Sequence, residues 1–250
     1  MVDATQPGAS ERAARVHDGM IEAVAPPEKI RRAYDLYSRF YGALIAPLER
    51  MPRMRALDRV AIGPHERVLE VATGPGETFA HIVARVAPEN IVEGVDLSPR
   101  MLERTRRRAA RTGRGNFHLQ QADARKLPFA DNTFDALYNS YMLDLIPFAD
   151  MPPVLAEFHR VLKPGGRLVL VNLSKRDAAT RPWLERLYQR LPRRWVPFVF
   201  GGCRPVLMER LVRAAGFADV ERQFVRHWMH TEIVTARKSS PRPRSSEEER

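Results

Sequence analysis

The chain has 250 residues, of which 44% are hydrophobic, enough for one domain with a substantial core and too many for a wholly disordered protein. It contains no run of 18 or more apolar residues, and its N-terminal sequence lacks the pattern of a secretory signal, so we expect a cytoplasmic protein. A single cysteine, Cys203, excludes an internal disulfide and a cysteine-based zinc cluster, and we expect no metal.

The net charge of +11 comes from 41 basic and 30 acidic residues, and 36 of the basic residues are arginine. Such a charge suits nucleic acid, an anionic membrane surface or acidic substrates as partners. A codon bias toward arginine produces the same composition without any partner, and we take it as the simpler explanation. The arginine cluster between Arg100 and Arg114 is accordingly interpreted as the solvated face of a helix.

Both ends of the chain are polar and contain little apolar periodicity. Segments of this kind cannot bury enough apolar surface to fold by themselves. We predict a disordered or loosely held segment at 1–27, a folded domain at 28–238 and a disordered tail at 239–250. The folded domain is expected to begin with a helical region at 28–60, because five side chains fall on one helical stripe: Tyr34, Tyr37, Tyr41, Leu44 and Leu48.

Strand-like and helix-like segments alternate beyond this region. Short apolar strands are predicted at 68–71, 91–95, 117–121, 134–138 and 168–171. Helices are predicted from Glu77 to about Val86, from the N-cap Ser98, and from Pro152 to the stop signal at 163–166. Such alternation indicates a mostly parallel sheet with helices on both faces.

The C-terminal region departs from this alternation. A helix at 205–215 is followed by two strand-like segments, 219–226 and 230–237, with only three residues between them. So short a link cannot make a parallel crossover, so the two strands must pair antiparallel. The predicted fold is α/β, with a seven-stranded, mostly parallel sheet and a C-terminal antiparallel hairpin.

The motif with the clearest chemistry is the turn 70–77, which reads EVATGPGE and follows the first strand. Its glycines allow a sharp turn and close approach of a ligand to the backbone. Twenty residues after Gly76, Asp96 ends the second strand, where a carboxylate can accept both hydroxyl hydrogens of a ribose. Turn and acid together favour a nucleoside-binding site over a plain loop.

The same motif narrows the choice of nucleoside cofactor. Phe79 occupies the third position of the dinucleotide fingerprint G-x-G-x-x-G, which opposes an NAD-dependent reductase. Glu70 places negative charge beside the turn, which suits a cationic ligand and opposes a pyrophosphate. A sulfonium compound therefore fits better than a dinucleotide.

Several ordered segments resemble the class I S-adenosylmethionine-dependent methyltransferases, and most closely the branch of the ubiquinone/menaquinone C-methyltransferases. The resemblance covers roughly residues 28–238 and rests on VLEVATGPGE (68–77), GVDLS (94–98), QADARKLPF (121–129), DNTFDALYNSYMLDLI (131–146) and VLKPGGRLVLVN (161–172). It implies a Rossmann-like class I methyltransferase fold, S-adenosylmethionine as cofactor and a small-molecule acceptor.

The resemblance also implies roles for individual residues. The methionine part of the cofactor would be surrounded by Glu70, Ala72, Gly74 and Gly76, with Asn139 and Tyr141 facing it and the methyl group. The ribose would be held by Asp96, and the adenine would contact Leu97, Asp123 and Ala124. Ala72 stands where the family commonly has glycine. Tyr141 and Asp144 are the candidates for acceptor contact or proton removal, and the N-terminal helical region would act as a lid.

The acceptor is expected to be hydrophobic: quinone-like, phenolic or lipid, and methylated on carbon or oxygen. The segment 174–205 lies where such enzymes insert an acceptor-side cap, and it surrounds the apolar run 195–200 with arginines. That composition also suits peripheral contact with an anionic membrane.

Three alternatives remain at this point: a membrane phospholipid amino-methyltransferase, a non-catalytic cofactor-binding protein that uses its basic surface for a partner, and an NAD-dependent reductase. A nucleic-acid substrate is disfavoured, because Asn139-Ser140-Tyr141 differs from the Asn/Asp-Pro-Pro-aromatic segment of amino-methylating nucleic-acid enzymes.

Overall fold

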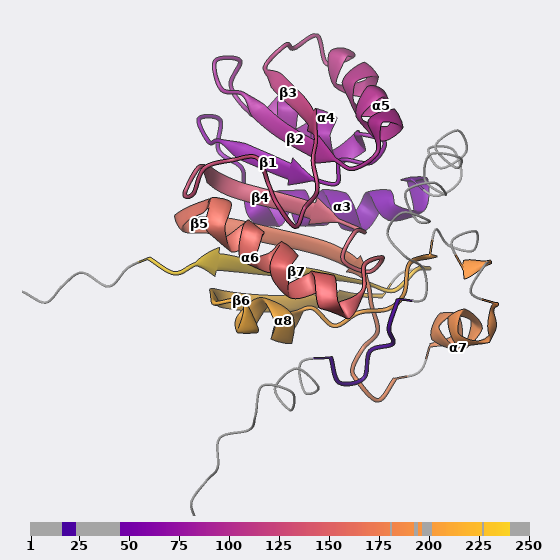
Figure 1. Ribbon diagram of the computed structural model, residues 1–250. Coiled ribbons are helices and arrows are strands. Elements are labelled where there is room, and N and C mark those ends of the chain that lie inside the picture. The colour runs from indigo at the N-terminus through magenta and orange to yellow at the C-terminus, as the bar shows by residue number, and fades with distance from the viewer. Residues whose placement is uncertain are drawn as a thin grey trace, which may run out of the picture.

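A seven-stranded sheet organises the part of the chain that the computed structural model describes, residues 17–23, 46–180, 182–192, 195–196, 202–226 and 228–240. The strands are β1 Val68–Val71, β2 Val92–Asp96, β3 Phe117–Gln121, β4 Phe134–Ser140, β5 Leu162–Leu173, β6 Phe217–Val225 and β7 Thr231–Lys238. Their spatial order is β3-β2-β1-β4-β5-β7-β6, and β7 runs antiparallel to both of its neighbours (Figure 1). The predicted mostly parallel sheet with an antiparallel hairpin is confirmed.

Helices cover both faces of the sheet, and each face has its own buried cluster. One face carries α3 Ala46–Val60, α4 Glu77–Arg85 and α5 Pro99–Ala110. The other carries η1 Phe148–Asp150, α6 Met151–Val161 and α8 Glu209–Ala214. In Figure 1, α6 and α8 lie in front of the sheet and α3 lies behind it. Every residue of β1 is buried, as expected for a strand covered on both sides. Within the described residues one more α-helix, α7 Trp183–Arg190, follows the end of β5 in the sequence.

Helix α5 begins where the sequence predicts. The Ser98 hydroxyl accepts a hydrogen bond from the Met101 amide at 3.2 Å, and Pro99 occupies the first helical position. Four side chains on one stripe face the core, namely Met101, Leu102, Thr105 and Ala109. Arg106 and Arg107 lie on the exposed side and pair with Glu103, so this part of the arginine cluster forms a solvated face.

Two element boundaries differ from the prediction. Strand β5 begins at Leu162, directly after α6, because residues 163–166 continue the strand through a register shift opposite Phe134 and Ala136. Helix α8 begins at Glu209 rather than at 205, because Val206 is paired with Ser174 in a short parallel bridge. The Met208 amide in addition donates to the Glu232 carboxylate at 2.9 Å. Contacts with segments distant in sequence thus occupy backbone groups that the local sequence pattern assigns to a turn and to a helix.

Part of the segment predicted to be loosely held, residues 17–23, contacts the domain. The buried Arg204 guanidinium donates to the Ile21 carbonyl at 2.6 Å, and Glu22 accepts from the Phe148 amide at 3.0 Å. The His17 ring stacks on Phe148 at 4.1 Å between centroids. The predicted stripe 34–48 lies outside the described residues except for the start of α3. Residues 197–200 of the apolar run and 241–250 of the tail lie outside them as well.

Candidate functional site

The order of the strands locates the site. The chain adds β2 and β3 on one side of β1 and then returns to add β4 and β5 on the other side. Adjacent connections therefore leave in opposite directions at the carboxyl ends of β1 and β4, and ligands of open α/β sheets bind in the crevice at such a switch point. The turn after β1, Asp96 at the end of β2 and Tyr141 after β4 all lie at this edge.

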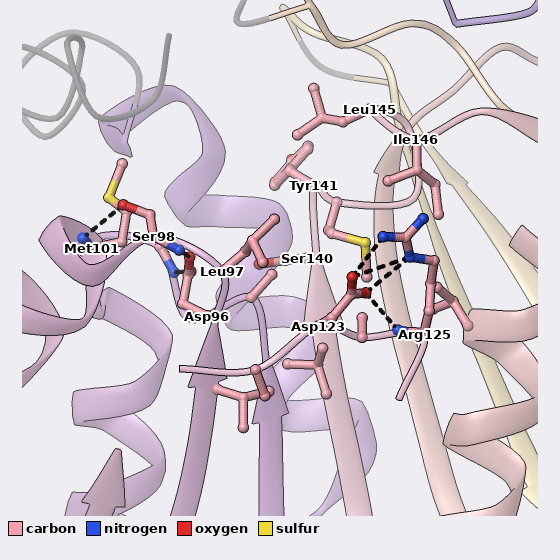
Figure 2. A pocket seen from close by; sticks show the side chains of 18 of the residues that line it. Asp96, Leu97, Ser98, Met101, Asp123, Arg125, Ser140, Tyr141, Leu145 and Ile146 are labelled. Atoms are coloured by element: carbon pink, nitrogen blue, oxygen red, sulfur yellow. Dashed lines mark hydrogen bonds and ion pairs between the residues drawn. The ribbon is translucent and has the colours of Figure 1, made fainter. Parts of the chain in front are cut away.

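A cavity opens at this edge, and Figure 2 shows it from close by. Seven of the eleven predicted site residues line it: Ala72, Gly74, Asp96, Leu97, Asp123, Ala124 and Tyr141. The other four, Glu70, Gly76, Asn139 and Asp144, do not line it and are buried. Four of the five motifs quoted above therefore converge on one cavity, although their lining residues are separated by up to about 70 residues of sequence; the fifth motif, 161–172, contributes no lining residue.

The turn between β1 and α4 has three residues in the left-handed backbone region. Gly74 has φ 53°, and a Cβ added there would meet nothing within 4 Å, so its backbone is open to the cavity. Gly76 has φ 78°, and a Cβ added there would lie 2.5 Å from Thr105 Cα on α5. Gly74 thus permits ligand approach, whereas Gly76 permits close packing of α4 against α5. Ala72 has φ 58°, a conformation that glycine adopts more readily.

Replacing Ala72 by glycine is expected to raise the free energy of unfolding by about 1 kcal/mol, because the left-handed conformation costs a residue with a Cβ about that much. Ala61, which has φ 48° and is exposed outside the cavity, gives the matched control Ala61→Gly. Urea denaturation of both variants should show similar gains in stability. A loss of stability for Ala72→Gly alone would show that its methyl group makes packing contacts worth more than the strain.

Asp96 links the glycine turn to the start of α5. Its Oδ2 accepts from the Gly74 amide and its Oδ1 from the Ser98 amide, each at 2.8 Å. These two backbone donors orient the carboxylate, and a carboxylate oxygen can accept more than one hydrogen bond. The side chain is 9% exposed and lines the cavity. This is the geometry required of an acceptor for two neighbouring hydroxyl groups.

Asp123 forms an ion pair inside the cavity wall. The Arg125 guanidinium donates to both Asp123 oxygens, at 2.7 to 3.1 Å (Figure 2). It also donates to Asp150 at 3.2 Å. The hydrogen bonds from Arg125 lower the pKa of Asp123, so the carboxylate stays ionised and remains an acceptor. The sequence gives no indication that Arg125 holds Asp123.

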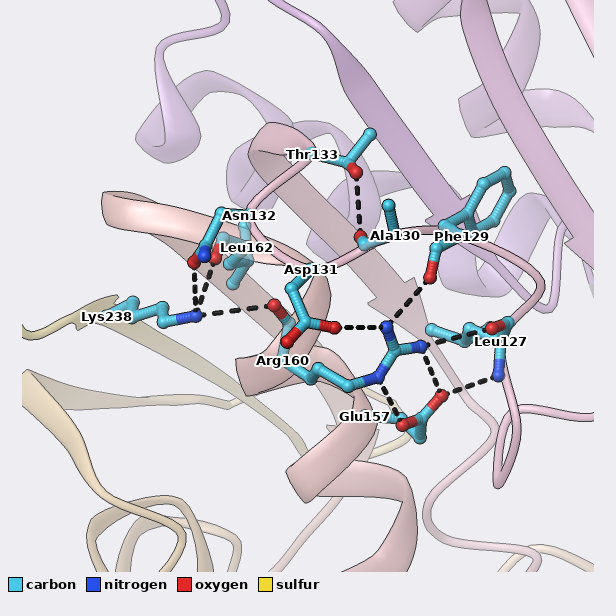
Figure 3. A network of polar contacts seen from close by, with 10 residues as sticks. All are labelled: Leu127, Phe129, Ala130, Asp131, Asn132, Thr133, Glu157, Arg160, Leu162 and Lys238. Carbon is cyan, nitrogen blue, oxygen red and sulfur yellow. Dashed lines mark hydrogen bonds and ion pairs between the residues drawn. The ribbon is translucent and has the colours of Figure 1, made fainter.

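A polar network anchors the segment that follows Asp123. The Leu127 amide donates to Glu157 on α6 at 2.7 Å, and Arg160 donates to the Leu127 and Phe129 carbonyls (Figure 3). Arg160 also pairs with Glu157 and Asp131. Because each of these hydrogen bonds has an ionised donor or acceptor, Arg160 or Glu157, they are of the stronger, charge-assisted kind. Helix α6 thereby positions the loop that carries Asp123 and Ala124.

Glu70 and Asn139 lie behind the cavity wall, at the ends of β1 and β4. The Asn139 side-chain amide nitrogen, Nδ2, donates to the Val71 carbonyl at 2.8 Å and so links β4 to β1. Glu70 is 1% exposed, and its Oε2, like Asn139 Oδ1, has no hydrogen-bond partner among the described residues. Burial raises the pKa of Glu70 well above its ordinary value, although Arg53 opposes the rise. Two buried oxygen atoms without a hydrogen-bond partner among the described residues therefore lie at this end of the site.

Tyr141 lines the cavity in a strained conformation. Its φ is 51°, which is rare for a bulky residue and is characteristic of functional sites. The hydroxyl is within hydrogen-bond distance of Thr231 Oγ1 at 3.2 Å, and the Arg53 guanidinium lies 5.2 Å from the ring centroid. Burial raises the pKa of Tyr141 well above its usual range, so the phenol stays protonated near neutral pH. It is therefore not suited to remove a proton, and its own hydrogen is directed to Thr231, because Thr231 donates its hydroxyl hydrogen to the Met229 carbonyl at 2.9 Å.

Asp144, three residues further on, is fully buried and does not line the cavity. Its Oδ2 accepts from the Leu173 amide at 2.8 Å, and its carbonyl accepts from the backbone and side chain of Arg204. Burial raises the pKa of Asp144 to about 7. These contacts hold the loop after β4 against the end of β5.

Sequence reasoning missed several residues of the cavity wall. Arg53 on α3 lines the cavity, as do the apolar side chains of Met142, Leu145 and Ile146 in the loop after β4. The apolar segment 142–146 was detectable as part of the fourth-strand motif, but periodicity does not show which of its side chains point to a ligand. Arg53 lies in a helix whose sequence carries no such signal.

Comparison with known proteins gives concordant results. Residues 68–166 match a family described as a methyltransferase domain. The chain is 32% identical over 160 residues to the ubiquinone/menaquinone biosynthesis C-methyltransferase UbiE of Geotalea daltonii, covering 62% of this chain and 67% of that protein. It is 32% identical over 210 residues to the demethylmenaquinone methyltransferase of Thermus thermophilus, covering 76% and 90%. The N-methyltransferase NodS of Bradyrhizobium japonicum, solved with S-adenosyl-L-homocysteine, has the same fold, with a TM-score of 0.64, 16% identity and coverage of 84% and 98%.

Proposed function

Because this chain belongs to the class I S-adenosylmethionine-dependent methyltransferases of the branch that contains the ubiquinone/menaquinone C-methyltransferases, we propose that it methylates a carbon atom of a quinone-like acceptor. The enzyme class and the cofactor follow from the family. The acceptor is inferred from one observation, namely the similarity over most of the length of two relatives whose names specify quinone substrates.

The cavity residues fit the cofactor. We assign the ribose hydroxyls to Asp96, whose carboxylate is held ready by two backbone amides. The adenine amino group is assigned to the ionised Asp123, with Leu97 and Ala124 beside the ring. We assign Glu70 and Asn139 to the part of the wall around the cationic amino-acid group, because they lie behind the wall at the ends of β1 and β4 and each has an oxygen with no hydrogen-bond partner among the described residues. These roles match the ones that the family resemblance implies.

Positioning is the main contribution that these residues make to the reaction. The bound cofactor supplies an electrophilic methyl group whose leaving group departs uncharged. The hydrogen that the methyl group replaces on the ring carbon of the acceptor is released to water as a proton. Alignment of the acceptor with the methyl group contributes most to the rate of such a displacement. Tyr141 is assigned to contact and orient the acceptor from the cavity wall, and Leu145 and Ile146 are assigned to exclude water. Asp144 is assigned to hold the loop that carries them.

The exposed aromatic side chains are relevant to a hydrophobic acceptor, because they are candidates for contact with a membrane. All three tryptophans of the chain are exposed, Trp183 by 57%, Trp195 by 53% and Trp228 by 69%. Tryptophan is enriched at membrane–water interfaces, and we propose peripheral contact with an anionic membrane through them. In the described residues no helix is long and apolar enough to cross a membrane. Co-sedimentation with anionic vesicles should be lost in the triple alanine variant; unchanged sedimentation would contradict the contact.

The acceptor is tested with methyl-labelled S-adenosylmethionine and three parallel reactions, containing a reduced demethylated quinone, phosphatidylethanolamine vesicles, or no acceptor. Label is expected in the quinone ring. Label in the lipid amine would instead support the phospholipid amino-methyltransferase. Tight binding of S-adenosylhomocysteine without any transfer would support the non-catalytic alternative.

A further inference from the structure

Residues 17–23 form a strap that contacts three parts of the domain (indigo in Figure 1). The Leu207 amide, shortly before α8, donates to the Met20 sulfur at 3.0 Å, and Met20 packs against the buried cluster on the α6 face of the sheet. Gly19 has φ 77° and lies so close to Ala178, beyond β5, that an added Cβ would be 2.5 Å from the Ala178 Cβ. The third contact is with the loop after β4.

Arg204 joins the strap to this loop. Its side chain is fully buried. Its Nε donates to the Ile21 carbonyl of the strap at 2.6 Å, its Nη1 to the Asp144 carbonyl at 3.0 Å and its Nη2 to the Ile146 carbonyl at 2.7 Å. The last two carbonyls flank Leu145, and Leu145 and Ile146 line the cavity as what we call the apolar wall. One guanidinium therefore holds the strap and the backbone of the apolar wall together.

Glu22 makes a second connection between strap and loop. Its Oε1 accepts from the Phe148 amide at 3.0 Å and lies 4.0 Å from Arg204 Nη2. The Phe148 ring stacks on the His17 ring at 4.1 Å between centroids, and the Arg204 guanidinium lies 5.3 Å from its centroid. The chain directly after the apolar wall is thus held by a side chain at each end of the strap.

The charge of Arg204 favours the same arrangement. Burial lowers the pKa of its guanidinium. The groups that oppose this effect are Tyr188, Glu22, Asp144 and Cys203. Of the two carboxyl groups among them, Asp144 has its pKa raised to about 7 by burial, whereas Glu22 is half-exposed and forms the ion pair. Because a buried cation without a partner is strongly unfavourable, release of the strap would cost Arg204 part of its compensation.

We propose that Glu22 and Arg204 are positioning residues, through which the strap holds the apolar wall where it contacts the acceptor. The side chains assigned to ribose and adenine, Asp96 and Asp123, are held instead by backbone amides and by Arg125. The strap therefore acts on the acceptor and not on the cofactor. The inference rests on the proposed function, because that function assigns the apolar wall to the acceptor side. The competing explanation is that the strap only adds stability.

Steady-state methyl transfer to a reduced demethylated quinone tests the positioning role. Glu22→Ala is expected to raise KM for the quinone about 5-fold, the effect of one ordinary hydrogen bond, and to leave kcat and the affinity for S-adenosylhomocysteine within about 2-fold. The same split is expected for Arg204→Lys, which keeps the charge but lacks the planar fork that reaches three carbonyls. If Arg204→Lys does not fold, Glu22→Ala decides alone.

The matched control is Asp18→Asn. Asp18 belongs to the same strap, is exposed, and lies 3.8 Å from the exposed Arg210 on α8 rather than at the loop after β4. This variant should leave KM, kcat and cofactor affinity unchanged. An unchanged KM in Glu22→Ala, or an equal loss of quinone and cofactor affinity, would overturn the proposal.

Hydrogen exchange tests the strap without any substrate. The Leu145 amide donates to the Met142 carbonyl at 3.0 Å. In Glu22→Ala this amide is expected to exchange faster than in the unmodified protein or in Asp18→Asn, because the loop opens more often. Equal exchange in all three proteins would overturn the proposal. If the unmodified protein does not methylate the quinone, the acceptor assignment has failed, and the exchange experiment still decides whether the strap holds the apolar wall.

Discussion

Replacing Asp96 by alanine is expected to weaken S-adenosylhomocysteine binding by about 100-fold or more. The carboxylate would lose two hydrogen bonds to ribose hydroxyls, each worth about 1.5 to 3 kcal/mol for a charged acceptor, and every 1.4 kcal/mol is a factor of ten. Asp96 also holds the amides of Gly74 and Ser98, so its removal loosens the turn as well. Calorimetric titration of the variant measures the combined loss.

A ligand that lacks one hydroxyl separates ribose recognition from loosening of the turn. The unmodified protein should prefer S-adenosylhomocysteine over its 2′-deoxy analogue by about 10-fold, whereas Asp96→Ala should bind the two equally. Retention of the full preference in Asp96→Ala would refute the ribose assignment, even if the overall affinity falls. Thermal unfolding of Asp96→Ala without ligand shows how much stability the protein loses when the hydrogen bonds from Gly74 and Ser98 are removed.

Replacing Asp144 by asparagine is expected to change how stability depends on pH. Burial raises the pKa of this acid from 3.8 to about 7. Between these values the unfolded chain gives up its proton while the folded chain keeps it, so stability falls as pH rises through this window. At 1.36 kcal/mol per pH unit, Asp144 therefore destabilises the protein by about 4 kcal/mol at pH 8 relative to pH below 4. Asparagine carries no charge and removes this dependence.

Urea denaturation at pH 4, 6 and 8 measures the effect as the difference between variant and unmodified protein. The free energy of unfolding of Asp144→Asn, relative to that of the unmodified protein, should rise by about 4 kcal/mol from pH 4 to pH 8. Asp135→Asn gives a control of opposite sign: burial opposes ionisation of Asp135, but hydrogen bonds from Lys163 and Arg67 lower its pKa. If the free energy of unfolding depends on pH in the same way for Asp144→Asn and for the unmodified protein, the raised pKa of Asp144 is contradicted.

The same variant tests the role in catalysis. Because Asp144 does not line the cavity, Asp144→Asn should keep its affinity for S-adenosylhomocysteine within a few-fold and should retain methyl transfer. Loss of transfer with unchanged stability and affinity would instead support the proton-removing role that the sequence first suggested.

Local sequence was sufficient for much of this protein. The glycine turn, Asp96 and the Ser98–Pro99 helix start were predictable, because each depends on backbone conformations and hydrogen bonds within a few residues. The alternation of elements and the short hairpin link determined the fold class, since parallel strands require long crossovers and a three-residue link allows only antiparallel pairing.

The direction of individual side chains was decided by tertiary structure. Tyr141 and Asp144 lie three residues apart in one motif. Tyr141 lines the cavity, whereas the Asp144 carboxylate accepts a hydrogen bond from the Leu173 amide at the end of β5. Arg53 joins the site from a helix on one face of the sheet, and Arg125 joins it by pairing with Asp123. Periodicity specifies that a helix or strand forms and which face is apolar. Which polar groups meet across the layers depends on how the elements pack, and that information is spread over the whole chain.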